Sequence, residues 1–172
     1  VDFMSQYTNI GKVGSASITD LGLCRYAREK FDFLIISTGM SVEKEVEECM
    51  EACKPDVVMH TNSSYPSSVN ELNLNYILWL KEKYPNCHIG YSGHEYGLVT
   101  TFAAVAMGAN WIERHVTLDR TMWGSDQLAS IETHGLIKLV KGIRDIELAK
   151  GSGGPRVLLN SEKLKRESLR KK

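Results

Sequence analysis

The chain has 172 residues, its 21 Lys and Arg residues are balanced by 21 Asp and Glu residues, and 42% of it is hydrophobic. This length fits one domain, and the composition is typical of a folded protein with a sizeable core. A net charge of zero gives no electrostatic basis for binding nucleic acid or an anionic membrane, and no apolar run is long enough for a membrane span. We therefore expect a cytoplasmic protein with reduced cysteines and no nucleic-acid or membrane partner.

Short β-branched segments alternate with helical patterns along most of the chain. The run 33–38 is continuously apolar, which is typical of a strand buried on both faces. Thr19 or Asp20 is expected to cap the first helix, and the spacing of Ser68 and Glu71 predicts a capping box for the third. The predicted strands are 11–15, 33–38, 57–60, 87–92 and 111–116, and the predicted helices are 19–30, 41–53, 68–84, 96–107 and 133–149.

This alternation of strands and helices predicts an α/β protein with a parallel sheet and helical crossovers. A repeat of about 20–30 residues favours a TIM-type (β/α) barrel, with a doubly wound open sheet as the alternative. A nucleotide-binding open sheet has little support, because the sequence contains no GxGxxG after the first strand and no GxxxxGK[ST]. We assign residues 1–150 to the barrel and residues 151–172 to a linker and basic tail.

Five predicted strands are fewer than the eight that a closed barrel requires. The chain begins with Val1, and we expect it to be a piece of a longer polypeptide. Its first and fifth strands would then each have an unpaired edge, so we expect the isolated chain to be inactive and to self-associate. Five apolar side chains are expected to face the barrel interior and to lose packing there: Val13, Leu34, Ile36, Val58 and Ile112.

Polar side chains follow every predicted strand, and the carboxyl ends of parallel strands meet at one edge of a sheet. His94 and His115 end consecutive strands, where two imidazoles can share one divalent ion. Asp126, from the loop after the fifth strand, would complete a set of two histidines and one carboxylate. The alternative is a hydrogen-bonded pair of structural histidines.

A lysine and several small hydroxyls gather at the same edge. A cationic lysine among hydroxyl donors is typical of a site for phosphate or carboxylate, although each residue alone is equally a hydrogen-bonding group at a strand end. Nucleophilic serine chemistry is disfavoured because no G-x-S-x-G motif is present. The residues of this predicted anion site are Lys12, Ser15, Thr38, Ser63 and Ser92.

Five motifs stand at the ends of the predicted strands: GKVGS at 11–15, ISTGM at 36–40, the segment 60–66, GYSGHE at 90–95 and ERH at 113–115. They resemble, in the same order, the signatures of the sialic acid synthase family. The loop 117–126 is similar to that family as well, and the likeness covers nearly the whole chain. Five ordered motifs are far more specific than any one of them.

The resemblance implies a (β/α)₈ barrel followed by a small antifreeze-like domain, in a homodimer. This chain would hold barrel strands four to eight, without strands one to three and without the antifreeze-like domain. Enzymes of the family condense phosphoenolpyruvate with an N-acylmannosamine, or with its 6-phosphate, to a nine-carbon 2-keto acid and phosphate. They use a divalent metal ion, Mn²⁺ or Mg²⁺.

The resemblance also implies a role for each matching residue. His94 and His115 match the metal ligands, and Tyr65 matches a residue that lines the sugar site. Asp126 matches a carboxylate that contacts the sugar or the metal-bound water, and we expect Glu113 to be catalytic together with Asp126 and Tyr65. Four residues match contacts to phosphoenolpyruvate: Lys12, Ser15, Ser63 and Ser92. Ser63 stands where some relatives carry Asn.

Two other functions remain open for the sequence. One is a truncated, non-catalytic protein that binds only metal or ligand, and the other is a different metal-dependent, aldolase-like barrel. An aldolase that forms a Schiff base needs a lysine in the middle of a strand, whereas Lys12 lies at a strand end. An assay of the condensation reaction separates these functions.

Overall fold

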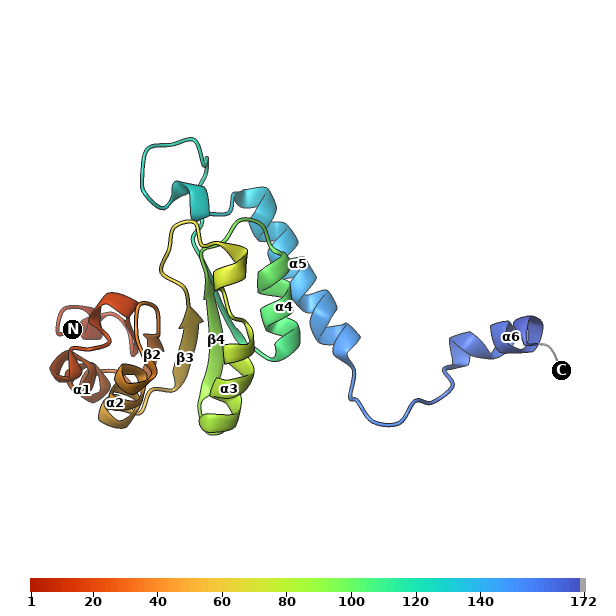
Figure 1. The fold of residues 1–172 in the computed structure, drawn as a ribbon, viewed down its shortest axis with the longest axis horizontal. Coiled ribbons are helices and arrows are strands. Elements are labelled where there is room, and N and C mark those ends of the chain that lie inside the picture. The colour runs from red at the N-terminus through yellow and green to blue at the C-terminus, as the bar shows by residue number, and fades with distance from the viewer. Residues whose placement is uncertain (171–172) are drawn as a thin grey trace.

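The computed structural model describes residues 1–170, and its five strands form one parallel sheet in sequence order. A helix connects each strand to the next, which confirms the predicted α/β class (Figure 1). The strands are β1 (Ile10–Val13), β2 (Phe33–Ser37), β3 (Val57–Thr61), β4 (His88–Gly93) and β5 (Trp111–Arg114). The helices are α1 (Leu21–Lys30), α2 (Glu43–Cys53), α3 (Asn75–Lys83), α4 (Val99–Met107), α5 (Thr133–Lys150) and α6 (Asn160–Leu169). The short 3₁₀ helix η1 (Met4–Gln6) precedes β1, and three others lie between the elements: η2 (Ser15–Ser17), η3 (Val69–Glu71) and η4 (Gln127–Ala129).

The sheet curls so strongly that its two edge strands approach each other. In a flat sheet, β1 and β5 would lie about 19 Å apart, at about 4.8 Å per strand. Instead, Lys12 Nζ on β1 lies 3.1 Å from Glu113 Oε1 on β5. The ring of Phe33 on β2 also stacks on Trp111 of β5, with 5.2 Å between the ring centroids. The five strands therefore form a half-barrel, which favours the barrel over the doubly wound alternative.

The outer face of the half-barrel packs against the helices. Cys24 of α1, Val46 of α2 and Ile77 of α3 are buried there with apolar side chains of the strands. Lys12 and Glu113 meet across the half-barrel, so their side chains point into its interior. Because side chains alternate along a strand, the residues directly before and after them point outward. The prediction that five apolar residues line the interior is therefore wrong, because these residues belong to the outer core: Val13, Leu34, Ile36, Val58 and Ile112.

Local capping was predicted correctly for one helix and wrongly for another. The Asp20 side chain caps α1 as predicted, by accepting a hydrogen bond from the backbone. The single helix predicted over 68–84 is wrong, because this segment divides into η3 and α3. Asn73, between them, has a φ of 44°, and asparagine tolerates this left-handed conformation, which interrupts a helix. The hydroxyl of Ser68 caps neither part.

The C-terminal segment leaves the half-barrel after α5. Residues 151–159 run away from the sheet to α6, which lies apart from the other elements (Figure 1). Nearly every residue of 151–170 is exposed. The tail predicted at 151–172 includes residues 171–172, which lie outside the described residues. Within residues 1–170, none of the helices combines the length and the apolar character needed to cross a membrane.

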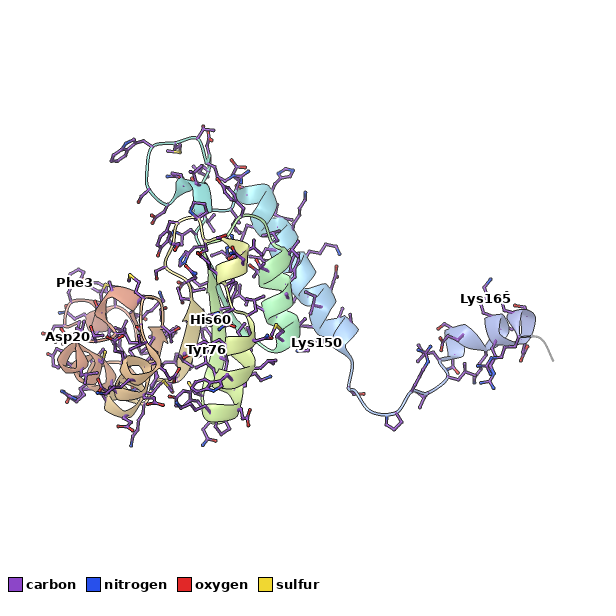
Figure 2. The ribbon with its side chains drawn as sticks, in the orientation of Figure 1. Phe3, Asp20, His60, Tyr76, Lys150 and Lys165 are labelled. Carbon is purple, nitrogen blue, oxygen red and sulfur yellow. The ribbon has the colours of Figure 1, made fainter. Side chains whose placement is uncertain are left out.

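Buried His60 makes the stability of the fold depend on pH. Its Nε2 lies 2.6 Å from the backbone oxygen of Leu72, and its ring packs against Tyr76 (Figure 2). Burial lowers the pKa of His60 below its ordinary 6.5, and the bond to Leu72 only partly opposes this. His60 therefore takes up a proton at higher pH in the unfolded chain than in the folded chain. Its contribution to the free energy of unfolding is fully present above the pKa of the unfolded state and is lost as pH falls through the pKa of the folded state.

We expect the unfolding temperature to fall between about pH 7.5 and pH 5 and the variant His60→Gln to show a smaller fall. Glutamine keeps a donor for the Leu72 carbonyl but does not titrate. Thermal unfolding followed by circular dichroism at both pH values measures the difference. An equal fall in the two proteins would show that His60 does not carry this pH dependence.

Candidate active site

The predicted anion site extends across the half-barrel. Glu113 Oε1 on β5 accepts a hydrogen bond of 2.9 Å from Ser92 Oγ on β4 and lies 3.1 Å from Lys12 Nζ on β1. The side chains of Lys12 and Glu113 keep 36% and 37% of their surface exposed, so an anion can reach the ammonium group. Glu113 is therefore the residue that connects β1, β4 and β5 at this edge.

Two further serines of the predicted site lie on either side of Gly39, at the end of β2. The N–H of Gly39 donates to Ser15 Oγ over 3.0 Å. A Cβ atom at position 39 would lie 2.1 Å from Ser63 Oγ and 2.8 Å from Ser15 Oγ. The hydroxyls of Ser15 and Ser63 thus come from different loops and meet where residue 39 has no side chain.

Ser37 was not among the predicted site residues. Its side chain lies on the same face of β2 as that of Phe33, because residues four apart on a strand share a face, so it faces the interior. The residue is 2% exposed, and within residues 1–170 its Oγ has no hydrogen-bond partner. A buried hydroxyl without a partner costs about 1–3 kcal/mol, which a bound anion would relieve. The sequence shows that Phe33 and Ser37 share a face of β2, but only the packing of the sheet shows that this face is the interior.

His94 and His115 follow neighbouring strands and lie side by side. The register pairs Gly93 with Arg114, the residues that precede them. Their ring centroids are 4.9 Å apart, and the ring planes are inclined by 84°. His94 Nδ1 lies 2.7 Å from the backbone oxygen of Asn62, so Nδ1 carries the proton and the lone pair of Nε2 remains free. Burial, followed by the nearby His115, lowers the pKa of His94, although the bond to Asn62 acts in the opposite direction.

Tyr65 and Asp126 complete this histidine cluster. The ring of Tyr65 lies 4.3 Å from the His94 ring and 5.6 Å from the His115 ring, measured between centroids. Asp126 Oδ2 lies 3.4 Å from His115 Nδ1. Burial and the Asp126 carboxylate raise the pKa of Tyr65, so its phenol group stays protonated. The structure thus brings together four predicted residues from three loops.

The histidine cluster fits a metal ion only in part. Within residues 1–170, no three His, Cys, Asp or Glu side chains are grouped as a metal site requires. Asp126 nevertheless lies close to the histidine pair, with its Oδ2 beside His115 and its Oδ1 accepting a hydrogen bond from Ser125. The imidazole pair does fit, because His94 shows the Nδ1–carbonyl bond that is common in metal-binding histidines.

A cavity of about 460 Å³ adjoins the anion site. Its lining includes Thr38, His60, Asn62 and Ser63 but neither histidine of the cluster. Its volume lies within the range of small-molecule sites.

Residues 1–154 match the NeuB family. The chain belongs to the NeuB family. This membership confirms the resemblance to sialic acid synthases. The N-acetylneuraminate-9-phosphate synthases of Drosophila melanogaster and Homo sapiens are 39% and 37% identical to this NeuB-family chain, over 143 and 145 residues. An N,N'-diacetyllegionaminic acid synthase of Legionella pneumophila is 36% identical over 151 residues.

These alignments cover 80%, 82% and 83% of this chain but only 38%, 40% and 42% of the relatives. This NeuB-family chain therefore spans about two fifths of the length of the curated relatives that it matches.

Solved structures show the same fold. The sialic acid synthetase of Leptospira borgpetersenii, in complex with citrate, matches with a TM-score of 0.82 and 36% identity, over 95% of this chain and 59% of that one. A truncated 3-deoxy-D-arabino-heptulosonate 7-phosphate synthase from Thermotoga maritima matches with a TM-score of 0.71 over 85% of this chain and 61% of that one. Its identity of 16% shows the fold alone.

Proposed function

We propose that this chain carries catalytic groups of a synthase that condenses phosphoenolpyruvate with an N-acylmannosamine or its 6-phosphate. The products are a nine-carbon 2-keto acid and phosphate. One observation supports this most: Ser92 and Glu113 of the anion site each lie two residues before a histidine of the cluster. Two residues along a strand span about 6.6 Å, which is the separation expected between the anion site and the histidine cluster. The reactive carbon of phosphoenolpyruvate bound beside Lys12 would then lie within reach of a sugar aldehyde held at the histidines.

The anion site suits the two charged ends of phosphoenolpyruvate. Lys12 supplies a positive charge, and the buried hydroxyl of Ser37 supplies a hydrogen-bond donor that has no other partner within residues 1–170. When an anion engages Lys12, the Glu113 carboxylate loses that partner and can accept a hydrogen bond from a hydroxyl or water close to the reacting carbon. We therefore assign the substrate phosphate or carboxylate to four predicted residues and one added residue: Lys12, Ser15, Ser63, Ser92 and Ser37.

The histidine cluster suits the sugar aldehyde. A divalent ion bound by His94 and His115, Mn²⁺ or Mg²⁺, would supply Lewis-acid polarisation of the aldehyde oxygen. Asn62 holds the His94 ring in the orientation that frees Nε2. The protonated phenol of Tyr65 can donate to a sugar oxygen, and Asp126 beside His115 can accept from a sugar hydroxyl.

We also propose that β1–β5 are strands four to eight of an eight-stranded barrel and that the complete protein is a homodimer. The half-barrel curvature and the coverage of 38% to 42% of the relatives support the first point. The family resemblance supports the second. Residues 151–170 would then lead toward a further domain, as the resemblance implies.

Release of phosphate from phosphoenolpyruvate by the complete protein tests the proposed function. We expect release that depends on an N-acylated sugar, and that stops with a chelator and resumes with Mn²⁺ or Mg²⁺. The sugar panel should include N-acetylmannosamine, its 6-phosphate and precursors of N,N'-diacetyllegionaminic acid, because a relative named for that product is 36% identical. No release with any sugar would refute the synthase and favour a non-catalytic protein.

Lys12→Met should raise the KM for phosphoenolpyruvate by about 10- to 100-fold, because a hydrogen bond to a charged group contributes about 1.5–3 kcal/mol. Lys44→Met is the matched control, since the Lys44 side chain is 83% exposed and pairs with Glu48 on the same helix, α2. Steady-state kinetics at saturating sugar measure both variants. An unchanged KM in Lys12→Met would remove this residue from the anion site.

Gly39→Ala should raise the same KM by about tenfold, because the new methyl group displaces the hydroxyls of Ser15 and Ser63. Gly14→Ala is its control: a Cβ there meets nothing within 4 Å, and the φ of −73° suits alanine. The two shortest contacts of the new methyl group are with serine hydroxyls, which can rotate away, and the unfolding temperature of both variants checks that they fold. Equal kinetics in the two variants would contradict the arrangement of the two serines around Gly39.

A further inference from the structure

A buried ion pair lies next to both histidines, and the proposed function does not use it. Glu95 directly follows His94, and Arg114 directly precedes His115. The side chains of Glu95 and Arg114 are 0% and 2% exposed, and Oε1 and Nη1 are 3.2 Å apart. A buried charge pair is by itself weak evidence that the pair stabilises the fold. The position of each partner next to a histidine instead indicates a role in the histidine cluster.

Every oxygen of the Glu95 carboxylate has a partner. The Tyr91 hydroxyl donates to Oε2 over 2.8 Å. The hydroxyls of Thr100 and Thr101, at the start of α4, donate to Oε1 over 2.6 and 3.1 Å. The guanidinium of Arg114 also lies beside Oε1. Together these partners fix the carboxylate in one orientation.

Arg114 fixes the backbone that follows His94. Its Nη2 donates to the backbone oxygen of Glu95 over 2.6 Å, and its Nη1 donates to that of Gly97 over 2.9 Å. Nη1 also donates to Thr101 Oγ1 over 2.9 Å. One guanidinium group thus ties β5, which carries His115, to the loop that carries His94.

Gly93 makes room for this arrangement. A Cβ atom at Gly93 would lie 2.7 Å from Glu95 Oε2 and 2.7 Å from Tyr91 Cε1. The Glu95 side chain therefore folds back over the last residue of β4. The sequence Gly-His-Glu at 93–95 turns the imidazole toward the site and the carboxylate toward the outer face.

We propose that Glu95 and Arg114 are positioning residues, which hold His94 and His115 at the separation and inclination that one divalent ion requires. This inference rests on the proposed function, because it takes the histidine pair as the metal ligands. Ligands must be held to within about 0.5 Å for tight binding, and partners behind the ligands typically contribute about 10- to 100-fold in metal affinity. The ion pair provides such a link between two strands.

Three variants test the role of the ion pair. Glu95→Gln removes the charge and keeps an acceptor, and Thr101→Val removes one shared hydroxyl while it keeps the shape of the side chain. Thr101→Ser restores that hydroxyl. None of these residues contacts a histidine ring among the interactions of the described chain.

The measurement is binding of Mn²⁺ to the complete protein without substrate, by electron paramagnetic resonance of free Mn²⁺, together with the unfolding temperature. We expect Glu95→Gln and Thr101→Val to bind Mn²⁺ about 10- to 100-fold more weakly and Thr101→Ser to bind it nearly as the unchanged protein does. Glu43→Gln is the matched control. The Glu43 carboxylate also accepts from a tyrosine hydroxyl and a cation, those of Tyr76 and Lys83, but lies between α2 and α3.

Each outcome decides the inference. Mn²⁺ binding that is weakened by Glu95→Gln and Thr101→Val, but not by Glu43→Gln at a similar loss of unfolding temperature, supports it. Equal Mn²⁺ affinity in all variants overturns the inference and leaves the proposed function intact. The same holds if Glu43→Gln weakens Mn²⁺ binding as much as Glu95→Gln and Thr101→Val do. An unchanged protein that binds no Mn²⁺ overturns both the inference and the proposed metal site. If Glu95→Gln does not fold, the comparison of Thr101→Val with Thr101→Ser decides alone.

Discussion

His94→Ala and His115→Ala will each slow phosphate release from phosphoenolpyruvate by about 10³-fold in the complete protein. Lewis-acid polarisation contributes several kcal/mol to a barrier, and each 1.4 kcal/mol is about tenfold in rate. Each variant removes one of two imidazoles whose rings lie 4.9 Å apart, and the structure offers no third ligand within residues 1–170 to replace it. Steady-state kinetics with added Mn²⁺ give the size of the effect.

His134→Ala is the control for this experiment. His134 lies exposed in the first turn of α5 and is not a member of the histidine cluster, so the variant should leave the rate unchanged. Binding of Mn²⁺ to the double variant of His94 and His115 should also be lost. Undiminished binding there would place the metal elsewhere and refute the assignment of both histidines.

Residues 1–172 expressed alone will catalyse no condensation and will self-associate. Within the described residues, β1 pairs only with β2, and β5 pairs only with β4, so each strand has a free edge of backbone N–H and C=O groups. Free edges pair readily with other chains. Ile10 on β1 is 48% exposed, which adds apolar surface beside one of these edges.

Light scattering on the isolated chain and the phosphate-release assay measure these two effects. The complete protein, treated identically, is the control and should be active and of defined size. A monodisperse monomer of the isolated chain with the turnover of the complete protein would show that five strands suffice.

The sequence by itself determined the order of the elements and the edge at which the polar residues gather. Apolar periodicity is a local property, so the run 33–38 and the alternation around it predicted the strands and helices of a parallel sheet. Placement of His94 and His115 side by side required only that consecutive parallel strands end at one edge. The boundary at Asn73 was missed, because a left-handed residue inside a helical pattern leaves no signal in the periodicity.

The tertiary structure alone decided how far the sheet curls and which side chains face inward. The contact of Lys12 with Glu113 joins the first and last strands of the sheet, and no local pattern contains that curvature. The hydroxyl of Ser37 lies buried without a partner within residues 1–170, and the path of the loop after β5 places Asp126 beside His115. Periodicity tells which residues alternate along a strand, but the face that becomes the interior follows from packing against the helices.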